Sequence, residues 1–83
     1  MRSRLERKVD LLRTIREHRG YPLTRVSSIA RLDFYEGKIF FDELVKSGLL
    51  VVNGQGKFRN ISVTMKGFKA LRKFDEIKEE FGE

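Results

Sequence analysis

The sequence predicts a mainly α-helical domain with one β-hairpin, in the order helix, helix, helix, strand, strand, helix. Two observations predict this order. Apolar residues recur at helical spacing in several stretches. A glycine-rich turn at 53–56, Asn-Gly-Gln-Gly, separates two short apolar runs. The chain has 83 residues, the size of one compact domain, so we expect residues 1–83 to form a single unit.

The first helix is predicted over residues 3–18. Ser3 and Glu6 have the spacing of a capping box, in which two side chains satisfy free amides at a helix start. Gly20 and Pro22 then end the helix, because glycine accepts the left-handed cap and proline cannot continue the hydrogen-bond pattern. The apolar stripe of this helix consists of Leu5, Val9, Leu12 and Ile15.

Residues 24–47 predict two further helices joined by a short turn. Thr24 is the expected N-cap of the second helix, and Asp33 that of the third, which ends before Gly48. The second helix is expected to bury Val26, Ile29 and Ala30 and to turn outward Ser27, Ser28 and Arg31. At 100° per residue, the expected core side of the third helix comprises Phe34, Gly37, Phe41, Leu44 and Val45. Its opposite side comprises Tyr35, Glu36, Ile39, Asp42, Glu43 and Lys46.

A hairpin over residues 49–63 and a last helix over residues 64–82 complete the predicted order. The strands are expected at 49–52 and 58–63, with Thr64 as the cap of the last helix. Three residues of that helix are expected to face the core: Met65, Phe68 and Leu71. A second stripe has the 4-3-4 spacing of a coiled-coil seam: Ala70, Phe74, Ile77 and Phe81. It predicts a symmetric homodimer, the alternative being that the stripe folds back onto the first helix.

The formal net charge of +6 is concentrated in the first third of the chain. Residues 1–31 hold nine Lys and Arg against three Asp and Glu, whereas residues 32–63 and 64–83 are each balanced. Such a distribution attracts a polyanion, with an affinity that falls as salt rises. The alternative interpretation is a solvated face that keeps the protein soluble.

Composition favours a cytoplasmic protein. Charged residues make up 36% of the chain, and there is no cysteine, which together lean toward an intracellular protein of a hot-adapted organism. No apolar run approaches the roughly 20 residues of a membrane helix, and the basic N-terminus lacks the apolar stretch of a signal peptide. We therefore expect no membrane partner.

Several short motifs resemble, in their order and spacing, the small archaeal winged-helix transcriptional regulators. These motifs are Thr24-Arg25-Val26, Ala30-Arg31-Leu32, Phe34, Phe40-Phe41, Leu44, Gly48-Leu49-Leu50 and Thr64-Met65-Lys66-Gly67. The resemblance implies a winged helix-turn-helix fold, DNA binding in transcription regulation or chromosome architecture, and dimerisation through the last helix. Gly37 departs from the family, which has a leucine there. A mid-helix glycine costs about 1 kcal/mol relative to alanine, so it either admits a close neighbour or bends the helix.

The expected partner is double-stranded DNA. In a helix-turn-helix the second helix enters the major groove and the first crosses the phosphate backbone. The predicted DNA-contacting residues are Arg25, Ser27, Ser28, Arg31, Tyr35, Lys38, Ile39, Lys46, Gln55, Lys57 and Arg59, with help from Arg2, Arg4 and Arg7. Two alternatives stay open. The carboxylates of the third helix would suit a protein partner, and the basic first helix would suit duplex RNA.

The sequence contains few residues suited to catalysis. His18 is the single histidine and cysteine is absent, so no second ligand or base accompanies it. The acidic residues near the C-terminus are spread along an exposed helix, which is typical of a solvated face. We therefore expect no enzymatic activity, no metal and no cofactor.

Overall fold

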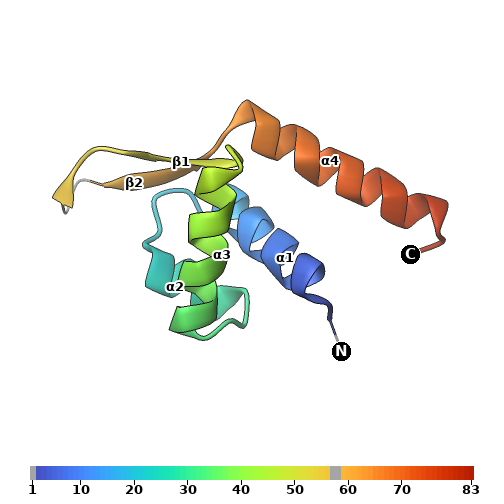
Figure 1. Ribbon diagram of the computed structural model, residues 1–83, viewed down its shortest axis with the longest axis horizontal. Helices are drawn as coiled ribbons and strands as arrows, with labels where there is room; N and C mark the ends of the chain where they lie inside the picture. Colours follow the sequence, from blue (N-terminus) through green and yellow to red (C-terminus); the bar gives the residue numbers. More distant parts are fainter. Residues whose placement is uncertain (1, 57–58) are drawn as a thin grey trace.

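The computed structural model describes residues 2–56 and 59–83, and this part of the chain forms four α-helices and one antiparallel hairpin in the predicted order (Figure 1). The elements are α1 (Arg4–Glu17), α2 (Leu23–Ile29), α3 (Phe34–Lys46), β1 (Leu50–Asn53), β2 (Asn60–Val63) and α4 (Met65–Glu80). This is the order of a winged-helix domain, which confirms the predicted fold class. The predicted start of the return strand, Phe58, lies outside the described residues.

Side chains cap three of the four helices as their sequences predict. Ser3 forms the full capping box, and Asp33 and Thr64 each accept a hydrogen bond from the amide three residues on. The prediction for α2 is wrong, because Thr24 lies within the helix and Pro22 occupies the N-cap without a side-chain hydrogen bond. Proline is tolerated at a helix start, where an N–H would have no partner inside the helix.

The core lies where α1, α2, α3, β1 and α4 meet. Its buried apolar residues are Leu11, Leu12, Ile15, Val26, Leu32, Phe40, Leu44, Leu50 and Leu71. The core side predicted for α3 is rotated from the observed one: Phe34 is half exposed, whereas Phe40 is only 2% exposed. The reason is the position of α1, whose Arg4 and Arg7 lie over the Phe40 ring.

The start of α4 crosses the base of the hairpin at Gly67. A Cβ on Gly67 would lie 2.4 Å from the Leu49 carbonyl oxygen and 2.6 Å from Cγ1 of Val63, so only glycine allows this approach. Of the three residues predicted to face the core, only Leu71 is buried, and Met65 and Phe68 are exposed. The close crossing turns the helix so that Gly67 and Leu71 make the contact instead.

One ion pair ties the middle of α4 to α1. Two nitrogens of Arg13 donate to the two carboxylate oxygens of Asp75, at 2.8 and 3.2 Å. Arg13 lowers the pKa of Asp75 by this hydrogen bonding. Beyond Asp75 the helix projects past α1, and α4 and the hairpin extend to opposite ends of the molecule (Figure 1). The molecule is accordingly elongated, with extents of 43 × 27 × 20 Å.

Candidate nucleic-acid interface

The third helix presents one exposed side to solvent. This side, the outer face of α3, consists of Tyr35, Lys38, Ile39, Asp42 and Lys46. Tyr35 is 82% exposed and Ile39 52%, so both extend an apolar surface outward. The face carries two lysines and one aspartate, and its net charge is therefore positive.

Two carboxylates predicted on this face lie elsewhere. Glu36 and Glu43 are half-buried and point to α1, where Arg7 pairs with Glu36. Glu43 accepts from Nη2 of Arg4 at 2.6 Å and is paired with Nζ of Lys8 at 2.7 Å. Hydrogen bonds from these two cations lower the pKa of Glu43 from 4.5 to about 2. The charges of both glutamates are thus neutralised by α1.

The cations at the start of α1 are engaged within the domain. Arg4 and Arg7 bind the glutamates of α3, and their guanidinium carbons lie 5.1 and 5.9 Å from the centre of the Phe40 ring. Arg2 pairs with Asp10 at 2.9 Å. The pairs of Arg4 and Arg7 hold α1 against α3, and the expected help of Arg2, Arg4 and Arg7 in phosphate contact stays a prediction.

The second helix and the following turn place three of the predicted residues on the surface. Arg25, Ser28 and Arg31 are exposed. Arg31 has a φ of 62°, a left-handed conformation that is uncommon outside glycine. The prediction for Ser27 is wrong, because its side chain is only 2% exposed and lies against Gly37 of α3. Ser27 is therefore unable to reach a ligand.

The ring of Tyr21 positions Arg25. The Arg25 guanidinium carbon lies 4.5 Å from the centre of the Tyr21 ring. The centre of the His18 ring lies 5.1 Å from the centre of the same Tyr21 ring. A cation held over an aromatic face has fewer rotamers to lose on binding. Tyr21 was not among the residues predicted from the sequence, and it lies in the loop before α2.

The hairpin brings Arg59, which directly precedes β2 at the turn end, next to α3. Gln55 and Arg59 are exposed, and Lys57 lies outside the described residues. A hollow of about 340 Å³ separates the hairpin from the start of α2 and from α3, and Lys38, Asp42 and Arg59 line it together with apolar residues. Residues 21 positions apart in the sequence, Lys38 and Arg59, thus share one hollow.

The predicted dimer seam divides into two parts. Ala70 and Phe74 are half-buried and line a hollow of about 200 Å³ between α1, α3 and α4. Leu5, which is 60% exposed, lies at the same hollow. Ile77 and Phe81 are 53% and 78% exposed on the projecting part of α4. Apolar side chains are therefore exposed both at this hollow and at the end of α4.

The chain is similar to Sso10a-2. The crystal structure of this DNA-binding protein from Sulfolobus solfataricus matches with a TM-score of 0.73 and 26% sequence identity, over 96% of this chain and 85% of the other. No protein-family model matches the chain, and no curated protein matches its sequence.

In the described part of the chain, neither a membrane-spanning helix nor a cluster of metal ligands is found. Its helices are all too short or too polar to cross a lipid bilayer. Residues 2–56 and 59–83 contain no group of three or more histidine, cysteine, aspartate or glutamate side chains placed to hold a metal ion.

Proposed function

We propose that this protein binds double-stranded DNA with the outer face of α3 in the major groove, as a transcriptional regulator or chromosomal protein. The observation that carries the proposal is a set of exposed cations on α2, the turn after it, α3 and the hairpin, of which Lys38 and Arg59 line one hollow beside α3. Within the described residues none of these forms a salt bridge: Arg25, Arg31, Lys38, Lys46 and Arg59. The similarity to a DNA-binding protein, Sso10a-2, supports the same function.

Each group of residues has a proposed role in the complex. Arg25, Arg31 and Arg59 bind phosphates, which orients the domain on the duplex. Tyr35 and Ile39 extend from the outer face of α3 and suit contact with thymine methyl groups, and Asp42 suits a cytosine amino group. Further contacts are proposed for Ser28, Lys38, Lys46, Gln55 and Lys57.

The ion pairs between α1 and α3 favour DNA over the two alternatives. A protein partner for α3 was suggested by its carboxylates, and Glu36 and Glu43 are neutralised by α1. The basic start of α1 suggested an RNA partner. The cations there, Arg4, Arg7 and Lys8, are the ones paired with Glu36 and Glu43. The side of α3 that stays exposed has a small positive charge and two apolar side chains, which suits a DNA groove.

We also propose a homodimer through Ala70, Phe74 and Ile77 of α4 and Phe81 at its C-cap. Ile77 and Phe81 would be exposed in a monomer, and exposed apolar surface of this kind commonly marks an interface. The charges of α4 support an antiparallel pairing. Residues 64–73 have a net charge of +4, and residues 74–83 have a net charge of −4. This distribution is unfavourable in an isolated helix, because the helix dipole favours negative charge at the N-terminus and positive charge at the C-terminus. Two antiparallel copies bring these opposite halves together.

Fluorescence anisotropy with a labelled random-sequence duplex over a salt series tests DNA binding. Three phosphate contacts per subunit, and six per dimer, predict a slope of log affinity against log salt of about −5. Competition with unlabelled duplex DNA and duplex RNA distinguishes the two nucleic acids. Absence of binding at low salt would refute the proposal, and stronger competition by RNA would transfer it to that ligand.

A further inference from the structure

One edge of the hairpin is free. Thr64 donates a backbone hydrogen bond to Leu49, and Leu50 is paired with Val63 in the register of the strands. Because hydrogen-bonded and non-hydrogen-bonded pairs alternate in an antiparallel ladder, Ile61 and Val63 turn their backbone groups away from β1. In residues 2–56 and 59–83, no backbone hydrogen bond from outside the hairpin reaches either residue.

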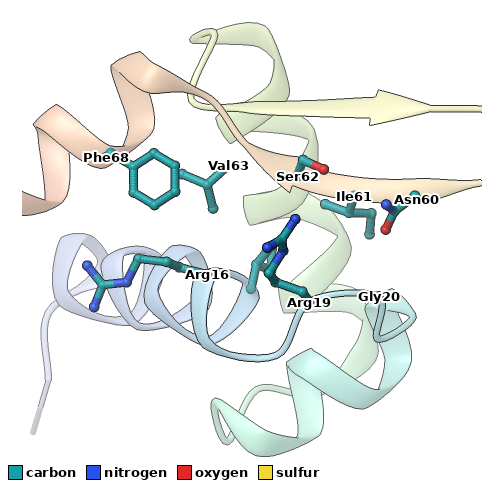
Figure 2. Close-up of a pocket in the computed structure, with 9 residues that line it drawn as sticks. Arg16, Arg19, Gly20, Asn60, Ile61, Ser62, Val63 and Phe68 are labelled. Atoms are coloured by element: carbon teal, nitrogen blue, oxygen red, sulfur yellow. The ribbon is translucent and has the colours of Figure 1, made fainter.

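A hollow of about 340 Å³ lies along this edge, between β2 and the end of α1. Figure 2 shows β1 on one side of β2 and α1 on the other, with the Arg19 side chain extending from the turn after α1 toward β2. Arg16 lies at the rim and points along α1. The hollow is lined by Ile15, Arg16, Arg19, Gly20, Asn60, Ile61, Ser62, Val63 and Phe68.

The lining combines three chemical features. Apolar side chains come from Ile15, Val63 and Phe68. Positive charge comes from Arg16 and Arg19, and no aspartate or glutamate is among the lining residues. Unpaired backbone donors and acceptors come from β2. An extended chain that alternates apolar and acidic residues matches all three, since successive side chains of a strand point to opposite sides.

We propose that the edge of β2 binds an extended acidic segment of a partner protein, which adds as a third strand. The backbone of the segment pairs with Ile61 and Val63, its acidic side chains meet Arg16 and Arg19, and its apolar side chains enter the hollow beside Phe68. A small anion or a phosphate would use the arginines but would leave the carbonyl groups of β2 without donors. An alternating peptide satisfies both.

This interaction goes beyond the proposed DNA binding and uses other residues. The hollow beside β2 shares no lining residue with the hollow of Lys38, Asp42 and Arg59 next to α3. The two proposals fail independently, because Arg19 belongs to one and Arg25 to the other.

The test uses the full chain and a fluorescein-labelled peptide with the core Val-Glu-Val-Glu-Val flanked by serines. We expect saturable binding below millimolar concentration, with NMR amide shifts concentrated at Ile61, Val63 and Arg19. Arg19→Ala should weaken binding roughly fivefold to tenfold, because it removes a charge-assisted hydrogen bond. Arg72→Ala is the matched control, an exposed arginine of α4 outside the hollow, and should leave the affinity unchanged.

Three further measurements can overturn the proposal. The same peptide methylated at alternate backbone nitrogens should lose binding, because it cannot donate to β2. Equal binding by the methylated peptide, or the same shifts with glutarate alone, would mean that the hollow takes only an anion. Shifts on α3 in place of β2, or an unchanged affinity of Arg19→Ala, would mean that the peptide acts as a general polyanion. Each of these results refutes strand addition.

Discussion

Ser27 of α2 and Gly37 of α3 lie in close contact where the two helices of the helix-turn-helix pack together. A Cβ on Gly37 would lie 2.1 Å from Oγ of Ser27 and 2.8 Å from its Cβ. The missing side chain at 37 therefore sets how closely α3 packs on α2. Of the two roles predicted for this glycine, the structure confirms the admission of a close neighbour.

Gly37→Ala is expected to destabilise the protein by roughly 1–2 kcal/mol. Alanine gains about 1 kcal/mol in helix propensity, but the collision with Ser27 forces the helices apart, at the larger cost typical of overpacking. Urea unfolding monitored by circular dichroism measures the change. Ser27→Gly in the same chain should recover much of the loss, and a double-mutant cycle would give the coupling. A Gly37→Ala protein as stable as the wild type would contradict the close approach.

Replacement of Arg31 is expected to separate stability from DNA affinity. A non-glycine residue at a φ of 62° carries roughly 1 kcal/mol of backbone strain, which glycine does not. Arg31→Gly should therefore be more stable than Arg31→Ala by about 0.5–1 kcal/mol, and both should lose the same phosphate contact. Thermal unfolding and duplex anisotropy of the two variants measure these effects. Equal stability would argue against strain at this turn.

Reversal of two charges tests the proposed DNA surface. Arg25→Glu combined with Arg59→Glu should weaken duplex binding at least about tenfold, because two phosphate contacts become repulsions. Both side chains are exposed, so circular dichroism should show an unchanged fold. Arg72→Glu on α4 serves as the control for net charge alone. An equal loss of affinity in that control would reduce the effect to overall charge.

Phe81→Glu tests the dimer with little risk to the fold. Its side chain is 78% exposed and lies on the projecting part of α4, whereas Phe74 is half-buried against α1. A glutamate in the apolar seam should shift the sedimentation mass from dimer to monomer. Phe81→Leu should keep the dimer. A wild-type protein that sediments as a monomer would reject the seam as an interface.

The ion pairs of Glu43 predict an acid-sensitive contact between α1 and α3. A carboxylate whose pKa is lowered from 4.5 to about 2 stabilises the fold above pH 4.5, and this contribution is lost as the pH falls from 4.5 to 2. Glu43→Gln should lower the melting temperature at pH 7 and flatten its pH dependence below 4.5. Glu17→Gln, at an exposed residue of α1, is the control. An unchanged pH profile in Glu43→Gln would show that the pairs add nothing to stability.

Local signals in the sequence predicted the elements and the three side-chain caps at Ser3, Asp33 and Thr64. Such signals act within a turn or two of the chain, so they can be read without knowing the neighbours of a helix. The sequence also showed the excess of positive charge in the first third of the chain. It could not reveal which of these cations remain available to a ligand.

That question was decided by tertiary packing. The rotation of α3 about its axis depends on the position of α1, and it buries Phe40 and brings Glu36 to Arg7. The burial of Ser27 likewise depends on a glycine ten residues away. Element order follows from short-range preferences of the chain, whereas the residues left exposed follow from how close and at what angle the helices pack.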